Sequence, residues 1–203
     1  MKKHLQIILV ILLVAVANLA SAQTNANETV KRIVKSFRDK KNVELSFNYQ
    51  YIVDASNTSD VQQGTAFLQG EAYKIILQEQ HTISDGKTIW TYLVEDEEVM
   101  VSNATEGSDN TPLKLLTTLD KDYTASYTDK STIMLTNPKG QYKVVTLSID
   151  PKSNTLIGME IHADDGSKMA IFIAETKFDQ DLKDGFFTFD KKDYPNVELI
   201  DMR

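Results

Sequence analysis

Apolar and polar side chains alternate along most of the chain after residue 40. Between residues 44 and 53 every second position is apolar or aromatic, at Leu45, Phe47, Tyr49, Tyr51 and Val53. A period of two residues is typical of a β-strand with one buried and one wet face. If the pairing of this strand with its neighbours shifted by one residue, the whole apolar row would face solvent. We therefore expect this row to line the concave side of a sheet.

Similar patterns, separated by turns rich in Gly, Asn, Asp and Pro, predict further strands. They lie over residues 61–69, 72–80, 87–94, 97–103, 123–128, 132–136, 142–149, 155–162 and 168–178. Phe186 to Phe189 closes the pattern before a polar tail. About ten to eleven antiparallel strands indicate a mainly β (α+β) fold, and so large a sheet tends to curl. It either closes into a barrel or stays open with helices as plugs.

Two helices accompany these strands. The first precedes them, and its apolar residues recur at the spacing of an amphipathic helix. They are Val30, Ile33, Val34 and Phe37. The second is inserted among the strands, where Thr111 followed by Pro112 is typical of a helix start. Its apolar residues are Leu113, Leu115, Leu116 and Leu119.

The N-terminus has the features of a secretory signal peptide. Lys2 and Lys3 precede an apolar run from Leu5 to Ala17, and Ala20-Ser21-Ala22 is a small-residue cleavage site. A retained membrane helix is the alternative, but the run is short for one. We expect residues 1–22 to be removed and residues 23–203 to form a single soluble domain outside the cytoplasm.

Charge and composition narrow the range of functions. The formal net charge is −7, and losing Lys2 and Lys3 takes it to −9, which argues against nucleic acid or an anionic membrane as a partner. The chain has no cysteine, hence no disulfide and no site for a lipid anchor. Nucleophile, metal and phosphate-binding motifs are missing from the sequence, so we expect no enzymatic activity, no metal and no cofactor. His162 near Asp164 is interpreted as a strand-end histidine beside a turn.

Rows of apolar residues are the most prominent feature that remains. Besides the row at 45–51, they include Tyr73/Ile75/Leu77, Val145/Leu147/Ile149, Ile157/Met159/Ile161 and Met169/Ile171/Ile173. Such rows form either an ordinary core or the lining of a cavity for an apolar ligand, to which flexible methionines would adapt well. The pattern alone does not decide between these interpretations.

Several short motifs, in their order, resemble the LolA family of periplasmic carriers of outer-membrane lipoproteins. They are SDGKTIWTY at 84–92, NTPLKLL at 110–116, LTNPKG at 135–140, FTF at 187–189 and D-x-R at 201–203. The first helix and the GTAFLQ strand at Gly64 also fall in register, so the resemblance covers nearly all of the chain after residue 22. Without a lipid-accepting cysteine, the chain is more similar to LolA than to its lipid-anchored relative LolB.

The resemblance implies an open, incomplete antiparallel β-barrel, with an N-terminal helix and a short inserted lid helix over an apolar cavity. It implies a carrier that takes lipoprotein acyl chains from the inner to the outer membrane. The implied partners are acylated lipoprotein cargo, an inner-membrane lipoprotein-releasing ABC transporter and an outer-membrane acceptor, LolB-like or unknown. We expect a monomer. A lipid-binding or envelope-stress-sensing module of the same architecture is one alternative, and a secreted hydrolase is another.

On this basis we expect two sets of functional residues. The cavity set is Leu45, Phe47, Tyr49, Tyr51, Ala66, Leu68, Tyr73, Ile75, Leu77, Trp90, Tyr92, Met169, Ile171 and Ile173. The lid set is Val30, Ile33, Val34, Phe37, Leu113, Leu116 and Leu119. The strand at 87–94 is apolar on both faces, and of these we choose the Trp90/Tyr92 face as the cavity face.

One departure from the family pattern affects the lid. Between Leu68 and Tyr73, family members carry a Lys-Arg-Pro stretch whose arginine bonds to the lid, whereas this chain has Gln69-Gly70-Glu71. Tyr73 also replaces a cavity phenylalanine of the family. With glycine in place of the arginine, we expect the lid to be held mainly by apolar contact rather than by charge-assisted hydrogen bonds.

Overall fold

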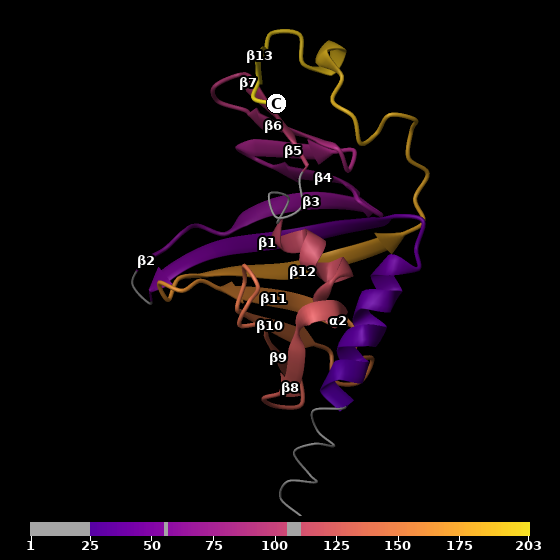
Figure 1. The fold of residues 1–203 in the computed structure, drawn as a ribbon, viewed down its shortest axis with the longest axis vertical. Helices are drawn as coiled ribbons and strands as arrows, with labels where there is room; N and C mark the ends of the chain where they lie inside the picture. The colour runs from indigo at the N-terminus through magenta and orange to yellow at the C-terminus, as the bar shows by residue number, and fades with distance from the viewer. Residues whose placement is uncertain (1–24, 55–56, 105–110) are drawn as a thin grey trace, which may run out of the picture.

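The computed structural model describes residues 25–54, 57–104 and 111–203. Its strands join in one continuous sheet (Figure 1). In chain order they are β1 (Val43–Asp54), β2 (Asn57–Thr58), β3 (Gln62–Gln69), β4 (Ala72–Leu77), β5 (Gln80–Ser84), β6 (Thr88–Leu93), β7 (Glu98–Asn103), β8 (Thr124–Tyr127), β9 (Thr132–Thr136), β10 (Val144–Ile149), β11 (Leu156–His162), β12 (Lys168–Phe178) and β13 (Glu198–Asp201).

The sheet is open, with β13 at one edge and β8 at the other. Its order is β13-β7-β6-β5-β4-β3-β1-β12-β11-β10-β9-β8, with β2 paired to β1. All neighbouring strands are antiparallel except β13 and β7, which are parallel. The long strands β1 and β12 join the two halves of the sheet. The prediction of a mainly β fold, with an open antiparallel sheet and an N-terminal helix, is confirmed.

The sheet has thirteen strands rather than ten to eleven. Residues 72–80 are not one strand, because β4 ends at Leu77 and β5 begins at Gln80. β13 lies in the tail that we interpreted as polar. There Glu198 pairs with Glu98 in a parallel ladder, and a partner so distant in sequence leaves no local pattern to detect.

Helical segments cover one face of the sheet, which we call the inner face. Residues 25–38 form the N-terminal helix, and its predicted apolar stripe is buried. Its basic side chains, by contrast, stay exposed, as in the Lys31–Glu28 pair. Within the described residues, no helix combines the length and the apolar character needed to cross a membrane. The predicted signal peptide, residues 1–22, lies outside them.

The predicted inserted helix is a 3-10 helix, η1 (Pro112–Thr117), followed by the short helix α2 (Leu119–Asp122). We call residues 111–122 the lid. Pro112 starts η1 as predicted, but the hydrogen bonds then join residues three apart, such as Lys114 N to Thr111 O. Leu113, Leu116 and Leu119 are themselves spaced by three. A 3-10 helix places such residues on one side, and this explains the difference from a regular α-helix.

The main core lies between the inner face and the two helical segments. The N-terminal helix and the lid contribute their apolar residues, and β1, β3, β4 and the strands from β8 to β12 contribute most of the rows predicted from the sequence. Leu45, Leu119, Ile133 and Leu147 are fully buried in it.

A second apolar cluster lies on the opposite, outer face. It consists of Val99, Val101 and Val197, with Trp90, Tyr92, Phe189 and Tyr194 packed against them. The residues after Asp181, which we call the C-terminal segment, cover this face and pass from β12 to the far edge of the sheet (Figure 1).

Strand register explains the position of Trp90. Ile89 stands opposite Ser84, and Ser84 stands opposite Tyr73 on the inner face. Trp90 stands opposite Ile83 and Val101, so it points to the other side. The prediction that Trp90 and Tyr92 face the cavity is therefore wrong, because the C-terminal segment provides a second apolar layer that the polar tail did not suggest.

Aromatic contacts hold the C-terminal segment on the outer face. The centroid of the Phe186 ring lies 4.8 Å from that of Phe67 and 5.1 Å from the Lys74 ammonium. Farther along, the Tyr194 ring lies 4.9 Å from that of Tyr92. His81 packs among them, with its ring centroid 5.5 Å from Tyr92 and 6.4 Å from Tyr194.

His81 is held in its neutral form by this packing. Its Nδ1 is buried and has no hydrogen-bond partner among the described residues. Burial lowers the pKa of His81, and the positive charge of Lys74 on β4 lowers it further. The rings of Tyr92 and Tyr194 face it from β6 and from the C-terminal segment. Burial lowers the pKa of Lys74, and the nearby charge of Asp193 offsets only part of this effect.

We expect this packing to weaken as the pH falls below about 6.5, the pKa of an unperturbed histidine. Because the folded-state pKa of His81 is lowered, its stabilising contribution is complete above that pH and is lost as the pH falls through the lowered value. Urea unfolding at pH 7.5 and pH 5, followed through the single tryptophan Trp90, measures the change. His81→Phe keeps an aromatic ring and should remove this part of the pH dependence. An unchanged pH dependence in the variant would contradict the assignment.

Candidate functional site

The inner face under the lid brings together most of the predicted cavity residues. Those buried in the main core are Leu45, Phe47, Ala66, Leu68, Tyr73, Ile75 and Ile171. All seven predicted lid-set residues are buried in the same cluster, Val30, Ile33, Val34, Phe37, Leu113, Leu116 and Leu119. In the described conformation the strands and the covering helices therefore pack directly against each other.

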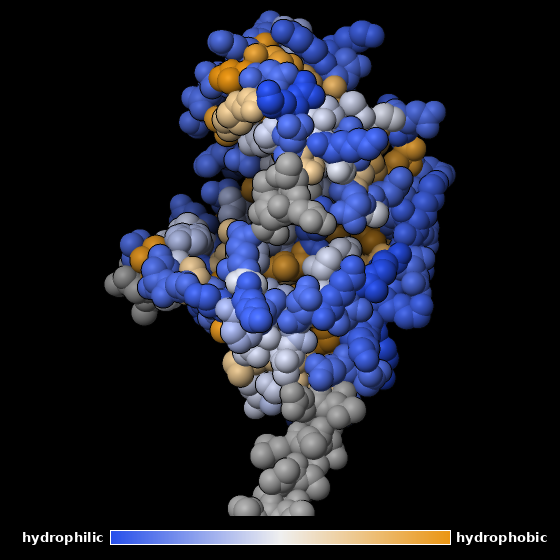
Figure 2. Space-filling model, viewed as in Figure 1, coloured by the Kyte–Doolittle hydropathy of each residue, from blue (hydrophilic) through white to orange (hydrophobic). Residues whose placement is uncertain are grey.

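The cover over this apolar interior is thin. In the space-filling view, apolar residues show through a hollow in the middle of the molecule, between largely hydrophilic surfaces above and below it (Figure 2). The helical segments that cross the same region in Figure 1 present their polar side to solvent. The apolar interior therefore lies only one layer of helix below the surface.

Other predicted residues lie at the margin of this core. Tyr49, Leu77, Met169 and Ile173 are partly buried against it. Tyr51 shares the inner face but is 42% exposed, because β1 extends past the helices there. Its hydroxyl lies 2.8 Å from Ser167 Oγ.

Close packing across β1 and β3 depends on Gly64. A Cβ atom at this position would lie 2.5 Å from Phe47 Cζ and 2.6 Å from Leu77 Cδ2. The missing side chain leaves room for the Phe47 ring to lie across the neighbouring strand, where it is 4% exposed. Gly64 was not among the predicted site residues, although a glycine within an alternating strand often marks such a close approach.

Polar contacts also hold the lid. Lys114 Nζ lies 3.1 Å from Glu71 Oε2 in the turn between β3 and β4. From the N-terminal helix, Arg38 donates to the Thr117 carbonyl at 2.8 Å and to Asp120 Oδ1 at 2.6 Å. The lid therefore has charge-assisted contacts beside the apolar ones through which we expect it to be mainly held. The turn between β3 and β4, where the family has its arginine, here supplies the carboxylate of Glu71, and the lid supplies the ammonium group of Lys114.

The free energies expected for these contacts nevertheless favour the apolar ones as the main attachment of the lid. The Glu71 side chain is 80% exposed, and exposed ion pairs contribute about 0.2–1 kcal/mol each. Full burial of a leucine side chain is worth roughly 1.5–3 kcal/mol, and Leu113, Leu116 and Leu119 are each at most 3% exposed. The polar contacts thus orient the lid, and the leucines provide most of its attachment.

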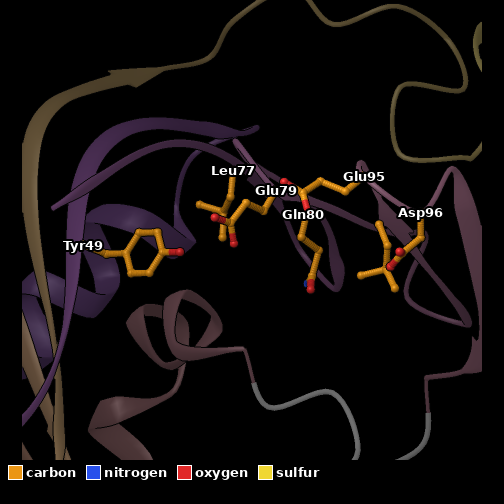
Figure 3. Close-up of a pocket in the computed structure, with 7 residues that line it drawn as sticks. Tyr49, Leu77, Glu79, Gln80, Glu95 and Asp96 are labelled. Carbon is orange, nitrogen blue, oxygen red and sulfur yellow. The ribbon is translucent and has the colours of Figure 1, made fainter. Parts of the chain in front are cut away.

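A pocket of about 300 Å³ opens at the end of the inner face (Figure 3). Its apolar lining comes from Tyr49, Leu77 and Leu93, and the carboxylates of Glu79, Glu95 and Asp96 also line it, together with Gln80. Tyr49 donates to Gln62 Oε1 at 2.6 Å. Burial, and then the charge of Glu79, raises the pKa of Tyr49, so its hydroxyl stays protonated. The sequence pattern did not predict that three acidic side chains line this pocket beside apolar ones.

The described residues were also compared with the arrangements that bind metal ions. Across residues 25–54, 57–104 and 111–203, no group of three or more His, Asp or Glu side chains is placed to hold a metal ion. His162 lies at the end of β11, 3.2 Å from Thr146 Oγ1 and 3.7 Å from Glu160 Oε2. The main chemical feature of the inner face is its apolar surface, which the N-terminal helix and the short lid cover.

Comparison with solved structures shows that this fold occurs in another protein. An uncharacterized conserved protein from Thermus thermophilus has a similar structure, with a TM-score of 0.54 at 11% identity over 87% of this chain and 99% of that one. Residues 77–190 match the family model described as "Outer membrane lipoprotein carrier protein LolA". The match spans more than half of the chain, and the chain belongs to the LolA family.

Curated relatives agree with this assignment. The outer-membrane lipoprotein carrier protein of Pasteurella multocida is 29% identical over 168 residues, which cover 78% of this chain and 81% of the relative. That of Haemophilus influenzae is 27% identical over 201 residues, which cover 94% of this chain and 93% of the relative.

The Lys114–Glu71 contact can be tested by reversing its charges. We expect Glu71→Lys and Lys114→Glu each to lower the free energy of unfolding, and the double variant to recover about 0.2–1 kcal/mol of the summed loss. Urea unfolding of the four proteins gives this coupling energy. High salt should reduce the coupling, and a coupling of zero at low salt would show that the pair does not form in solution.

Phe47 tests whether the inner face is tightly packed. Phe47→Ala should lower the free energy of unfolding by about 3–5 kcal/mol, the usual loss for a buried phenylalanine. Phe172→Ala is the control, because Phe172 lies on β12 but is 52% exposed, and we expect a loss of about 0.5 kcal/mol or less. Similar small losses in both variants would mean that the Phe47 site is loosely packed or already open.

Proposed function

We propose that this protein is a periplasmic carrier that holds the acyl chains of lipoproteins between the inner face of the sheet and the lid. The signal peptide predicted at residues 1–22 would direct the chain to the periplasm. The family match and the names of the curated relatives support the lipoprotein cargo. The observation that carries the proposal is the continuous apolar contact between a short lid and a broad apolar sheet face.

Hydrocarbon chains need such a cover to cross an aqueous space. Exposing a CH₂ group to water costs about 0.8 kcal/mol, so an acyl chain of roughly sixteen carbons costs on the order of 12 kcal/mol. A bare lipoprotein anchor with several chains would therefore stay in its membrane. Apolar contact is non-directional, and the same inner face can accept either the lid leucines or the acyl chains.

Loading then exchanges one apolar contact for another. In the described conformation Leu113, Leu116 and Leu119 occupy the inner face, so cargo binding requires the lid to move outward. The lid is suited to this because it is short and because its ion pair with Glu71 is exposed. The cavity for cargo thus forms as the lid leaves, and the acyl chains replace the contacts that are lost.

Charge around the open pocket favours a lipoprotein anchor over a phospholipid. Glu79, Glu95 and Asp96 line it beside apolar residues, and carboxylates repel the phosphate of a phospholipid head group. The acylated cysteine of a lipoprotein carries no phosphate. A module of the same architecture with a different lipid cargo is the second candidate, and a neutral lipid would satisfy the same pocket.

The direction of transport and the partners complete the proposal. The carrier would receive acylated lipoproteins from an inner-membrane lipoprotein-releasing ABC transporter and deliver them, as a monomer, to an outer-membrane acceptor that is LolB-like or of another kind. Native mass spectrometry of protein purified from its own periplasm tests the cargo. Co-purified lipoprotein supports the carrier, and a co-purified phospholipid would favour the second candidate.

Lid movement can be tested with a fluorescent fatty-acyl probe. We expect Leu116→Glu to release the probe faster and to bind it more weakly than the wild type, because a carboxylate cannot occupy a site where the leucine is 1% exposed. Lys121→Glu is the matched control, since it adds a carboxylate to an exposed position of the same lid. Wild-type probe kinetics in Leu116→Glu would show that the lid takes no part in binding.

A further inference from the structure

The seam between β11 and β12 opens at one end. Their antiparallel ladder runs from His162–Lys168 to Gly158–Phe172 and ends there. Beyond this point β12 continues along β1 as far as the pair of Phe178 with Val43, while Leu156 of β11 stays with Ile149 of β10. The two strands therefore diverge, and the sheet is split at this seam.

A β-bulge lies on each side of the split. On β12 the partners of β1 step from Glu175 to Ile173, which leaves Ala174 as the extra residue. On β11 the partners of β10 step from Gly158 to Leu156, which leaves Ile157 as the extra residue. Bulges bend a strand and re-aim its side chains, and they are frequent next to binding sites. Here they direct the side chain of Ile157, which is 48% exposed, toward the split.

The split forms a groove of about 520 Å³, which we call the β11–β12 slot. The N-terminal helix, which runs past the end of β12 in Figure 1, closes its base with Ile33 and Phe37. Leu156, Ile157 and Ile173 are among the apolar residues that line its sides. Because Ile33, Phe37 and Leu156 also belong to the main core, the slot is continuous with the apolar interior under the helices.

We propose that the β11–β12 slot is a binding site for one fatty acyl chain, reached from the side of the sheet and not from under the lid. This inference rests on the proposed function, which supplies acylated cargo. In the described conformation the lid leucines already fill the inner face. The slot would let a first acyl chain bind in this conformation. Once seated, the chain lies against the N-terminal helix and extends the main core.

The polar rim fits the end of an acyl chain. Arg32 lines the slot and donates to Thr29 Oγ1 at 2.9 Å. A guanidinium has five N–H donors, so others remain for the ester or amide carbonyl where an acyl chain begins. Glu175, also on the rim, lies 3.2 Å from Lys177 Nζ, so its charge is partly balanced.

An extended peptide would be a poorer occupant. Adding a strand requires a run of free backbone groups, and usual strands have at least three residues. On the β11 side only Leu156 and Ile157 lie beyond the end of the ladder. A hydrocarbon chain requires no backbone ladder and gains from each apolar wall.

Photolabelling of the full-length mature protein tests the site. The probe is a palmitoyl chain with a diazirine at its terminal carbon, cross-linked by light and mapped by mass spectrometry of peptides. We expect adducts on residues 153–157 and 173–178 and on the N-terminal helix. Labelling confined to the lid and the inner face would overturn the slot while leaving the carrier function intact. No saturable binding of the probe at all would count against the carrier function itself.

A matched pair of variants supplies the second measurement. Ile157→Asn removes an apolar wall of the slot, and we expect about a tenfold higher Kd for the probe, which corresponds to about 1.4 kcal/mol. Phe172→Asn alters a similarly exposed residue of β12 that is not among those lining the slot, and it should change the Kd less than twofold. Equal effects of the two variants would contradict the proposal, and so would displacement of the bound probe by an apolar peptide alone but not by free palmitate.

Discussion

An open sheet with one apolar face must be covered, and that requirement organises the whole molecule. A closed barrel would bury such a face by itself, and a sandwich would bury it against a second sheet. This chain covers its inner face with two helical segments that are far apart in sequence, the N-terminal helix and the lid. Neither could remain folded in place without the sheet, because both bury their apolar side against it. The cover is therefore as stable as its apolar contacts, and those are the contacts that an apolar ligand can replace.

Apolar residues on the outer face also need a cover, and a different part of the chain provides it. Near β6 and β7 the strands carry apolar residues on both sides, and the C-terminal segment supplies the second cover. Its aromatic contacts and its short parallel strand leave the inner face free for the helices. The two covers do not compete, since register sends Ile89 to one side and Trp90 to the other. The proposed ligand exchange on the inner face would therefore leave the cover of the outer face in place.

Alternation in the sequence was sufficient to predict β1 and the burial of Leu45 and Phe47, because one buried face imposes a strict period of two. It did not show that the row becomes exposed farther along, at Tyr51 and Val53. The same reasoning could not choose a face for the strand containing Trp90, whose two sides are equally apolar. It also missed β13, whose partner is 100 residues away in the chain. Leu113, Leu116 and Leu119 are buried, but the first two lie in a 3-10 helix, which their spacing of three fits better than the α-helix that Pro112 suggested. Bulges set a further limit: the row Ile157, Met159 and Ile161 alternates regularly in the sequence, yet Leu156 takes the inner position and Ile157 is the extra residue. A bulge is fixed by the partner strand, so the strand's own residues give no warning of it.

The position of β13 also has a consequence for how the chain folds. Until the last residues have been synthesised, Trp90 and Tyr92 have no cover and β7 is an unpaired edge, a state that favours association with other chains. The central pair of β1 and β12 likewise joins residues such as Val43 and Phe178, and contacts so distant in sequence form slowly. The outer face of β6 and β7 is thus covered last, after all the other strands of the sheet have been synthesised.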